Sequence, residues 1–332
     1  MTPEVELLQL FEWDSSAQNL KLREELAAGL LRPQACIEPK FFYDPLGSRL
    51  FEAITELPEY YPTRTEAAIF REYMPAIGQA LGSDFTLIDL GCGSCGKAGR
   101  LFHAGILPAR YLAIDISVDF LRESLQHLKR ELPAIEMTGI GLDFTDDLQL
   151  PDDLPPGRRM FFYPGSSIGN FSPPEASDFL KRLAGQMDAT GGLLIGVDLI
   201  KDKAVLDAAY DDALGVTAAF NRNLLRHVNV RLDADFDIGD WRHVAFFNEA
   251  ESRIEMHLEA RRALETSWPD GAGHRVRHFA AGERIHTENS YKYSPAGFKT
   301  LLTEAGFDAI QMWADPRAWF ALFFARQAVT RT

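Results

Sequence analysis

The sequence predicts an α/β fold built around a doubly wound, mostly parallel sheet. Two observations support this prediction. Between Thr86 and about Ile200, short apolar segments alternate with amphipathic helical segments, which is the pattern of repeated strand–helix units. The first of these strands runs directly into a glycine-rich turn at 91–96, where sheets of this kind bind ligands.

The elements of this region can be placed in order along the chain. Strands are predicted at 86–90, 111–115, 140–144, 159–163 and 191–198, and helices from Ala98, at 118–132 and at 173–186. Ligands bind outside the carboxyl ends of such strands. Functional residues are therefore expected at the glycine turn, Asp115, Asp143 and 165–170.

The flanking segments follow a different pattern. Up to about residue 40 the chain is predicted to be helical, because leucines 20, 22, 26, 30 and 31 form an apolar stripe. Residues 41–66 combine aromatic residues with proline and glycine, and predict either a packed loop or a lid over a small-molecule pocket. After Asp198 we expect helix at 201–226, strands at 242–248, 253–260 and 283–293, a helix at 295–306 and strand at 307–325. Accordingly, 62–200 with 291–332 is predicted as the core, and 1–61 with 201–290 as a second unit.

Composition limits the class of protein. The 332 residues include 46% hydrophobic and 25% charged residues, as in a soluble globular protein. A net charge of −14 argues against nucleic acid as a partner. No apolar run approaches the ~18 residues of a membrane span, and the acidic N-terminus is unlike a signal peptide. We expect a cytoplasmic enzyme that acts on a small-molecule substrate and has no membrane partner. The oligomeric state stays open, with a monomer favoured.

The glycine turn predicts a nucleotide-like cofactor. Gly91, Gly93 and Gly96 match the G-x-G-x-x-G spacing, which nicotinamide, flavin and S-adenosylmethionine enzymes share. Asp89, just before the turn, would repel a pyrophosphate but suits a cationic amino-acid tail. Asp115 suits a ribose diol in either case. Asp143 and Phe144 could bind and cover an adenine, so S-adenosylmethionine is favoured over a dinucleotide.

The turn also contains Cys92 and Cys95, spaced as in a redox pair or half a zinc site. The third cysteine, Cys36, lies far upstream, and no second C-x-x-C completes a tetrahedral site. We interpret both thiols as small residues tolerated between glycines, and expect no metal.

Several stretches resemble one family. The sequence DLGCG with the acids at 115 and 143 looks like a Rossmann-type, class I methyltransferase. More specifically, FFYDPLGSRLFEAITELPEYYPTRTEA (41–67), GSSIGNF (165–171), DLIKD (198–202), YDDALGVTAAFNRN (210–223), RIEM (253–256) and GERIHTENSYKY (282–293) resemble the histidine Nα-methyltransferases of ergothioneine biosynthesis. The resemblance implies a methyltransferase core with a substrate-binding unit. It also implies trimethylation of the histidine α-amine to hercynine, with S-adenosylmethionine as methyl donor.

The resemblance also implies roles for single residues. It assigns the substrate carboxylate to Asn170 and Tyr210, with Gly165 in the same loop, and the imidazole to Glu288 and Ser290 beside Met256. It places Tyr43, Tyr60 and Phe51 around the amine, and Lys97 at the cofactor's carboxylate. Taken alone, Asn170 could be a turn or helix-cap residue, Glu288 a solvated charge and Met256 core packing.

Alternatives stay open at this point. The same scaffold could methylate tryptophan or tyrosine. A non-catalytic cofactor-binding module is disfavoured by the intact glycine turn with Asp115 and Asp143. A methyltransferase of proteins or nucleic acids is disfavoured by the aromatic segment, which predicts a closed pocket, and by the negative net charge. The histidines at 227, 243, 257 and 286 are expected to be structural or exposed. No His–Asp pair stands out as a general base, so Tyr43 is assigned amine positioning rather than proton transfer.

Overall fold

The structure is a computed structural model that describes residues 6–9, 16–145, 148, 150, 157–188, 190–271 and 273–327. The N-terminal residues on which the absence of a leader was predicted lie outside this part. The chain forms two compact units. The first comprises Met1–Phe11, Pro62–Ile200 and Tyr291–Thr332, and the second comprises Glu12–Tyr61 and Lys201–Ser290.

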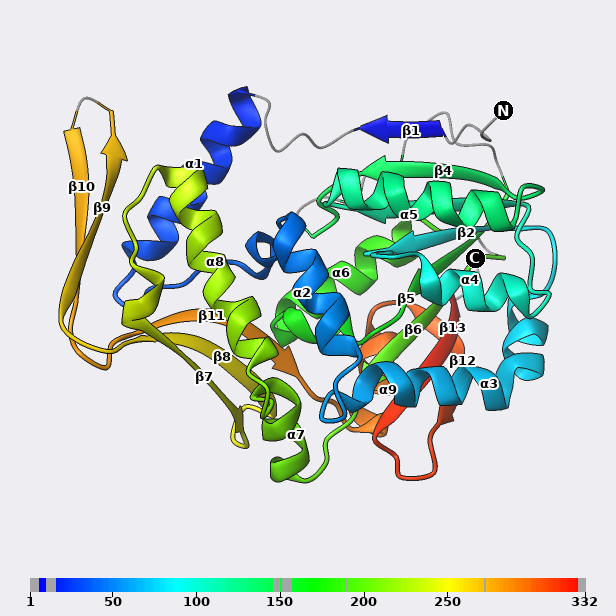
Figure 1. The fold of residues 1–332 in the computed structure, drawn as a ribbon. Coiled ribbons are helices and arrows are strands. Elements are labelled where there is room, and N and C mark those ends of the chain that lie inside the picture. Colours follow the sequence, from blue (N-terminus) through cyan, green and yellow to red (C-terminus); the bar gives the residue numbers. More distant parts are fainter. Residues whose placement is uncertain are drawn as a thin grey trace. The chain divides into compact units, whose positions relative to one another are not determined.

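The first unit contains an eight-stranded sheet in the order β1-β4-β3-β2-β5-β6-β13-β12 among the described residues (Figure 1). The strands are β1 Glu6–Gln9, β2 Phe85–Leu90, β3 Arg110–Asp115, β4 Glu136–Gly141, β5 Arg158–Tyr163, β6 Gly192–Asp198, β12 Phe307–Ala314 and β13 Phe320–Gln327. Strands β1 to β6 pair in parallel, whereas β13 is antiparallel to both β6 and β12. The predicted α/β fold with a mostly parallel sheet is confirmed.

Helices cover both faces of this sheet. They are α3 Tyr61–Leu81, α4 Gly96–His103, α5 Val118–Glu131, α6 Pro173–Gly185 and α9 Pro295–Glu304, with a short 3-10 helix, η2, at Ser167–Asn170. One apolar cluster joins α3, α4 and α5 to the sheet, and the other joins α6 and α9 to it. Because both faces are covered, the central strands are mostly apolar, and every residue of β6 is buried.

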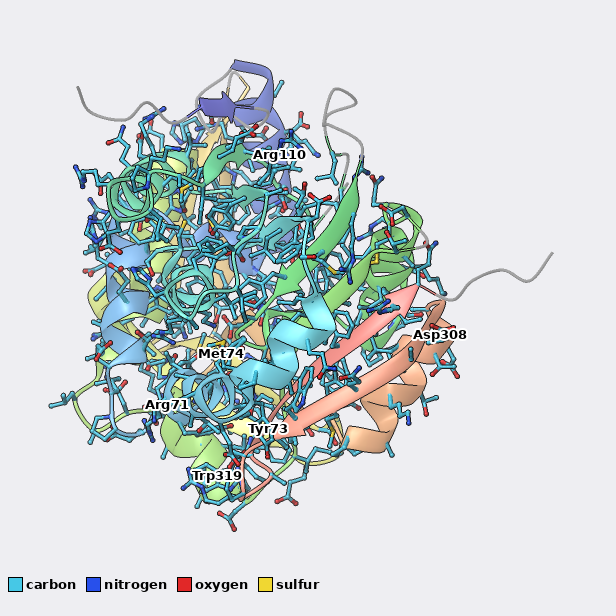
Figure 2. All side chains as sticks on the ribbon, turned by 90° about the vertical axis from the view of Figure 1, so that its right-hand side faces the viewer. Arg71, Tyr73, Met74, Arg110, Asp308 and Trp319 are labelled. Atoms are coloured by element: carbon cyan, nitrogen blue, oxygen red, sulfur yellow. The ribbon has the colours of Figure 1, made fainter. Side chains whose placement is uncertain are left out.

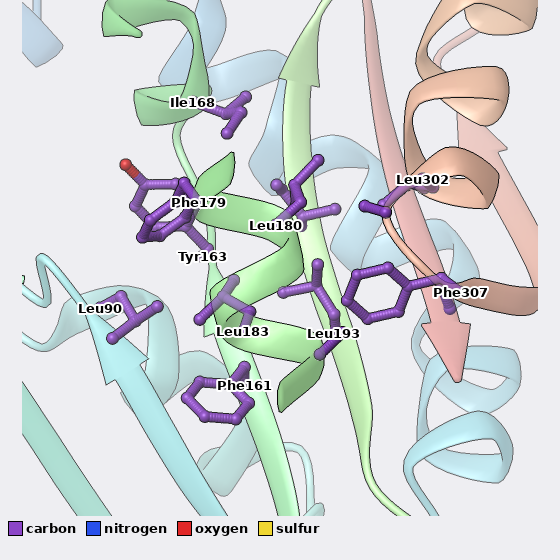
Figure 3. Close-up of a cluster of buried hydrophobic side chains, with 14 of the residues drawn as sticks. Leu90, Phe161, Tyr163, Ile168, Phe179, Leu180, Leu183, Leu193, Leu302 and Phe307 are labelled. Carbon is purple, nitrogen blue, oxygen red and sulfur yellow. The ribbon is translucent and has the colours of Figure 1, made fainter. Parts of the chain in front are cut away.

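Figure 3 shows the cluster beneath α6 and α9. Phe161 on β5 and Leu193 on β6 meet Leu183 of α6, while Phe307 approaches from β12; all four side chains are buried. Fully burying one such side chain stabilises the fold by about 1.5–3 kcal/mol. At the N-terminal ends of β3 and β4 the sheet reaches solvent. Arg110 of β3, labelled in Figure 2, pairs there with Glu136 of β4 at 3.1 Å.

The second unit combines helices with a three-stranded sheet in the order β11-β8-β7 and a separate hairpin of β9 and β10. Its elements are α1 Ser16–Leu30, η1 Pro39–Phe42, α2 Pro45–Thr55, α7 Lys203–Tyr210, α8 Val216–Leu232, η3 Ile238–Asp240, β7 Trp241–Asn248, β8 Arg253–Ala260, β9 Leu264–Asp270, β10 Gly273–Phe279 and β11 Arg284–Tyr291. Helix α8 contacts α1, α2, β7 and β8, so it is the centre of this unit (Figure 1).

Two predictions about the N-terminal third are wrong. Glu6–Gln9 forms a strand paired with β4, whereas a helix was expected there. The aromatic segment is largely helical rather than a loop, because two of its three prolines lie where helices begin. Pro45 starts α2, where Asp44 accepts a bond from the Gly47 amide (2.7 Å), and Pro62 lies at the start of α3.

Candidate functional site

The glycine turn lies between β2 and α4. Gly91 and Gly93 have φ values of +67° and +51°, in the left-handed region that favours glycine. The amide of Gly91 donates to the Ile114 carbonyl at 2.8 Å, which fastens the turn to the end of β3. A side chain at Gly93 would meet no atom within 4 Å, so this backbone faces open space.

Asp115 lies at the end of β3 and joins that strand to the turn. Its Oδ2 accepts from the Gly93 amide at 3.0 Å, and its Oδ1 accepts from the Ser117 amide at 2.9 Å. Burial raises the pKa of Asp115, while these backbone donors oppose the shift. The structure thus brings together the glycine and the acid that the sequence predicted as cofactor-binding.

Asp143 and Phe144 follow the end of β4. Asp143 is buried and accepts from the Thr145 amide at 3.1 Å. The Phe144 ring packs edge-on against Tyr163 at 5.9 Å, and a Cβ on Gly91 would lie 3.6 Å from it. The predicted adenine-binding residues therefore lie beside the turn.

Asp89 lies beneath the turn and is only 1% exposed. Its Oδ2 accepts from the Tyr111 hydroxyl at 2.8 Å, and its buried Oδ1 has no partner among the described residues. Burial raises the pKa of Asp89 to about 7, against the lowering effect of the Tyr111 hydrogen bond. The unmatched oxygen is a ready acceptor for a cationic donor.

Cys92 and Cys95 are buried free thiols within the same turn. Burial, together with the neighbouring Cys95, raises the pKa of Cys92, which keeps it protonated and a poor nucleophile. Among the residues that the structure describes, no group of three or more His, Cys, Asp or Glu side chains could hold a metal ion.

Lys97, in the first turn of α4, forms an ion pair with Glu66 of α3 (Nζ–Oε2, 2.8 Å). The other carboxylate oxygen of Glu66 accepts from the Gly165 amide at 2.7 Å. Side chains on Gly165 and Gly196 would collide with this group, their Cβ atoms lying 2.5 Å from Lys97 Nζ and 2.3 Å from Glu66 Oε1. A buried carboxylate therefore links two residues that the sequence assigned to cofactor and substrate.

Asn170 is the last residue of η2 and is half-buried. It is not the cap of the next helix, because Ser172 and Glu175 form the capping box of α6. The preceding loop is held by Ser166, whose hydroxyl accepts from the Asp198 amide at 2.8 Å. Asp198 in turn forms a fully buried ion pair with Lys292 at 2.7 Å.

The second unit gathers the predicted aromatic residues into one cluster. Tyr43 packs edge-on against Phe51 (5.9 Å between ring centroids), Phe51 against Tyr60 (6.2 Å), and Tyr60 against Tyr210 (6.2 Å). Phe220 of α8 contacts both Tyr43 and Phe51 at about 6 Å. Residues separated by up to 177 positions, from Tyr43 to Phe220, thus form a continuous aromatic surface.

Two of the predicted substrate residues of this unit are in contact, and two more are buried. The Tyr210 hydroxyl donates to Ser290 Oγ at 2.8 Å, with both groups buried. Met256 is 2% exposed and Glu288 is 9% exposed. The Tyr210 backbone is held by His243, whose Nε2 lies 2.8 Å from the Tyr210 carbonyl and whose Nδ1 lies 2.8 Å from Asn221 Nδ2.

The four histidines singled out in the sequence all have structural partners. Besides His243, His227 contacts the Phe41 carbonyl at 2.7 Å, His286 contacts Asn289, and His257 contacts Glu255. Burial lowers the pKa of each of the four, to about 4 for His257, so they are neutral near pH 7. Each is therefore occupied in holding the second unit together.

S-adenosylmethionine fits the first unit. The turn offers open backbone at Gly93, carboxylates at Asp115 and Asp143 suit a ribose and an adenine, and Asp89 has a buried oxygen with no partner among the described residues. A doubly wound sheet with this arrangement at successive strand ends defines a nucleoside-cofactor enzyme, and the acid before the turn favours the methyltransferase class over dinucleotide enzymes.

The family follows from comparison with known proteins. The profile of a family described as histidine-specific methyltransferase, SAM-dependent, matches residues 22–327, and the chain belongs to this family. It is 42% identical to the histidine N-alpha-methyltransferase of Mycolicibacterium smegmatis, over 94% of this chain and 96% of that protein. The corresponding Mycobacterium tuberculosis protein is 40% identical over 93% and 96%. Ergothioneine biosynthesis protein 1 of Schizosaccharomyces pombe is 28% identical over 95% of this chain and 40% of that longer protein.

Sequence reasoning missed three residues of this site: Glu66, Tyr111 and Phe220. Glu66 looks like an exposed residue on an amphipathic helix, and its only signal is that it lies within the segment 41–67 that carries the resemblance. Phe220 had a usable signal, because it lies within the segment 210–223 that carries the resemblance.

No helix of the described part of the chain is long and apolar enough to cross a membrane.

Proposed function

We propose that this protein transfers methyl groups from S-adenosylmethionine to the α-amine of L-histidine, three in succession, to give hercynine in the ergothioneine pathway. Family membership and the names of the bacterial relatives support this substrate. The structural observation that carries the proposal is the second unit's combination of an aromatic cluster with the buried bond from Tyr210 to Ser290. A small zwitterion that gains positive charge needs both kinds of surface.

S-adenosylmethionine supplies a methyl group already activated by the sulfonium, which is displaced in line by a neutral amine. The chain's own contribution is to position that amine, exclude water and favour its uncharged form. The faces of Tyr43, Phe51 and Tyr60 suit a cation that grows from ammonium to quaternary ammonium, because ring faces attract cations without needing a hydrogen bond. Full methylation removes every N–H donor, and this cluster still binds the product.

The rest of the substrate is recognised by polar groups. Asn170 offers an amide donor to the carboxylate, and Tyr210 offers its hydroxyl, whose single proton must turn from Ser290 to the substrate. Glu288 and Ser290 serve the two ring nitrogens of imidazole, and Met256 limits the volume beside them. Tryptophan or tyrosine would leave part of this buried polarity unmatched, which costs about 1–3 kcal/mol per group.

Proton removal has no dedicated base in this proposal. The buried histidines are held by structural partners and none is free to cycle a proton. The α-amine of a free amino acid is mostly protonated at neutral pH, so the site has to favour its uncharged form by excluding water, and Tyr43 has a positioning role. Cytoplasmic location, the monomeric state and the absence of nucleic-acid and membrane partners stay predictions.

The decisive experiment is to incubate the protein with labelled S-adenosylmethionine and each of the twenty amino acids, and to follow product mass. We expect histidine alone to gain one, two and then three methyl groups, with the trimethylated form accumulating. Preferential methylation of tryptophan or tyrosine would establish the alternative substrate. Product from no amino acid would reject an amino-acid methyltransferase.

A further inference from the structure

The sheet of the second unit has two distinguishable faces. Strands β7 and β8 are antiparallel, and paired residues share a face. His243, Ala245 and their partners Leu258 and Met256 lie on the side of α8, because His243 bonds to Asn221 of that helix. We call this the helix face. The other side, the outer face, carries Arg242, Phe246, Glu255, His257 and Glu259.

Strand β11 begins with its even-numbered residues on the outer face. Arg284 forms an ion pair with Glu259 at 2.8 Å, and the His286 ring meets His257 at 5.1 Å. Side chains alternate along a strand. Regular alternation would therefore place Glu288 and Ser290 on the outer face as well, away from Met256.

The structure departs from that alternation. Ser290 accepts from Tyr210, whose carbonyl is held by His243 of the helix face, so Ser290 lies on the helix face. Burial shows the same shift: Ile285 and Thr287 are buried between partly exposed neighbours, then Glu288 is buried too, Asn289 is partly exposed and Ser290 is buried. The alternation of side chains between the two faces therefore shifts by one residue between Thr287 and Glu288, and we call this the change of phase. A β-bulge redirects side chains in the same way.

A hydrogen bond spans this change of phase. His286 Nε2 lies 2.9 Å from Asn289 Oδ1, although residues three apart on a regular strand point to opposite faces. His286 is itself fixed, by its ring contact with His257 and by backbone bonds to Ala35 (2.8 Å) and from Ile37 (2.9 Å). The anchored His286 can thus hold Asn289 on the outer face.

We propose that Asn289 is a specificity-determining positioning residue: by bonding to His286 it keeps Glu288 and Ser290 on the helix face with Met256 and Tyr210. This rests on the proposed function, in which those four residues contact the substrate. The Asn289 side chain lies on the opposite face, so it acts through the backbone of β11, which it shares with Glu288 and Ser290.

The test is Asn289→Leu, which keeps the side-chain size but removes the acceptor. We expect the KM for histidine to rise roughly tenfold or more, the range for misplacing one buried hydrogen-bonding group. At saturating histidine, kcat should stay within about twofold, since the amine-contacting aromatics are untouched, and affinity for S-adenosylhomocysteine should not change. Asn289→Asp retains an oxygen acceptor for His286 and should restore the KM.

Two further variants make the result decisive. Gln34→Leu is the matched control, because Gln34 Nε2 donates to β11 at the Arg284 carbonyl (2.7 Å), before the change of phase; its KM for histidine should equal wild type. His286→Phe keeps the ring but loses the donor, and should reproduce Asn289→Leu should that variant fail to fold.

The inference is overturned if Asn289→Leu or His286→Phe folds and keeps the wild-type KM. It is also overturned if the KM for histidine rises and the affinity for S-adenosylhomocysteine falls in the same variant. Glu288→Ala is measured in parallel. A raised KM in Glu288→Ala alone would reject the role of Asn289 while keeping the proposed function. A wild-type protein that does not methylate histidine would reject both.

Discussion

Replacing Gly196 with alanine should disturb both halves of the first unit's site through Glu66. A Cβ at this position would lie 2.3 Å from Glu66 Oε1 and 3.0 Å from the Gly165 amide nitrogen, so the carboxylate must move. The Gly165 amide then loses its 2.7 Å acceptor, which costs about 1–3 kcal/mol for a buried donor. The Lys97 ion pair adds roughly 0–1 kcal/mol, because the lysine side chain is 30% exposed.

The expected loss of about 2 kcal/mol corresponds to a fall in Tm of roughly 4–8 °C, measured by thermal unfolding monitored by circular dichroism. Calorimetry should also show weaker binding of S-adenosylhomocysteine, since Lys97 loses its fixed position. Gly185→Ala is the control: a Cβ there meets nothing within 4 Å, and the change should be neutral or slightly stabilising.

The role of Glu66 in this loss can be isolated. In a Glu66→Ala background the collision disappears, so Gly196→Ala should cost much less than in wild type. Equal costs in the two backgrounds, or a Gly196→Ala protein as stable as wild type with unchanged ligand affinity, would refute the reasoning.

Three other predictions concern separate groups. Asp115→Ala should abolish tight binding of S-adenosylmethionine, and NADH should not bind; unchanged calorimetry, or saturable NADH fluorescence, would contradict the cofactor assignment. Histidinamide should be a much poorer substrate than histidine, because Asn170 and Tyr210 are predicted to bind a carboxylate, and equal turnover would remove them from the site. Burial lowers the pKa of His257 to about 4, below the usual value of about 6.5. The free energy of unfolding should therefore not depend on His257 above pH 6.5, and should fall by roughly 3 kcal/mol as the pH falls from 6.5 to 4. His257→Phe should flatten that part of the stability–pH curve.

The sequence predicted the first unit better than the second, and the reason is physical. Strand–helix alternation is a local signal, and a glycine turn followed by Asp115 and Asp143 places residues at strand ends by topology alone. The helix at 45–55 is not predictable from composition, because proline and glycine usually indicate that a helix is interrupted. Here Pro45 is the first residue of the helix and Asp44 is its N-cap.

Contacts between distant segments were not predictable in this way. Glu66 is 99 residues from Gly165, and no periodicity in α3 marks it as buried. The change of phase in β11 was equally hidden, because its residues continue to look like an ordinary strand; the shift is visible only once Arg284, His286 and Ser290 have partners on known faces. Of the residues named from the family resemblance, Tyr43, Phe51, Tyr60, Tyr210 and Ser290 form one chain of contacts, and the substrate roles of all of them stay predictions.

The identity of the substrate depends most on Glu288 and Met256, and changing both should alter specificity. Both side chains are buried, at 9% and 2% exposure, so neither is a solvated surface residue. Removing the carboxylate with Glu288→Ala strands an imidazole N–H and should cost histidine about 1–3 kcal/mol, or roughly five- to 150-fold in kcat/KM.

Met256→Val adds space beside that position, since Met256 lies opposite Ala245 on the helix face and no larger side chain fills the place from β7. An indole is larger than an imidazole and has a single N–H, so it gains from the added volume and loses little from the missing carboxylate. The double variant should therefore methylate histidine less and tryptophan more, as steady-state kinetics on both amino acids would measure. Met256→Val alone should keep its preference for histidine, because Glu288 and Ser290 remain. A double variant with the wild-type kcat/KM for histidine would mean that other residues bind the imidazole, and the choice of histidine over a larger amino acid would then have no support in this part of the structure.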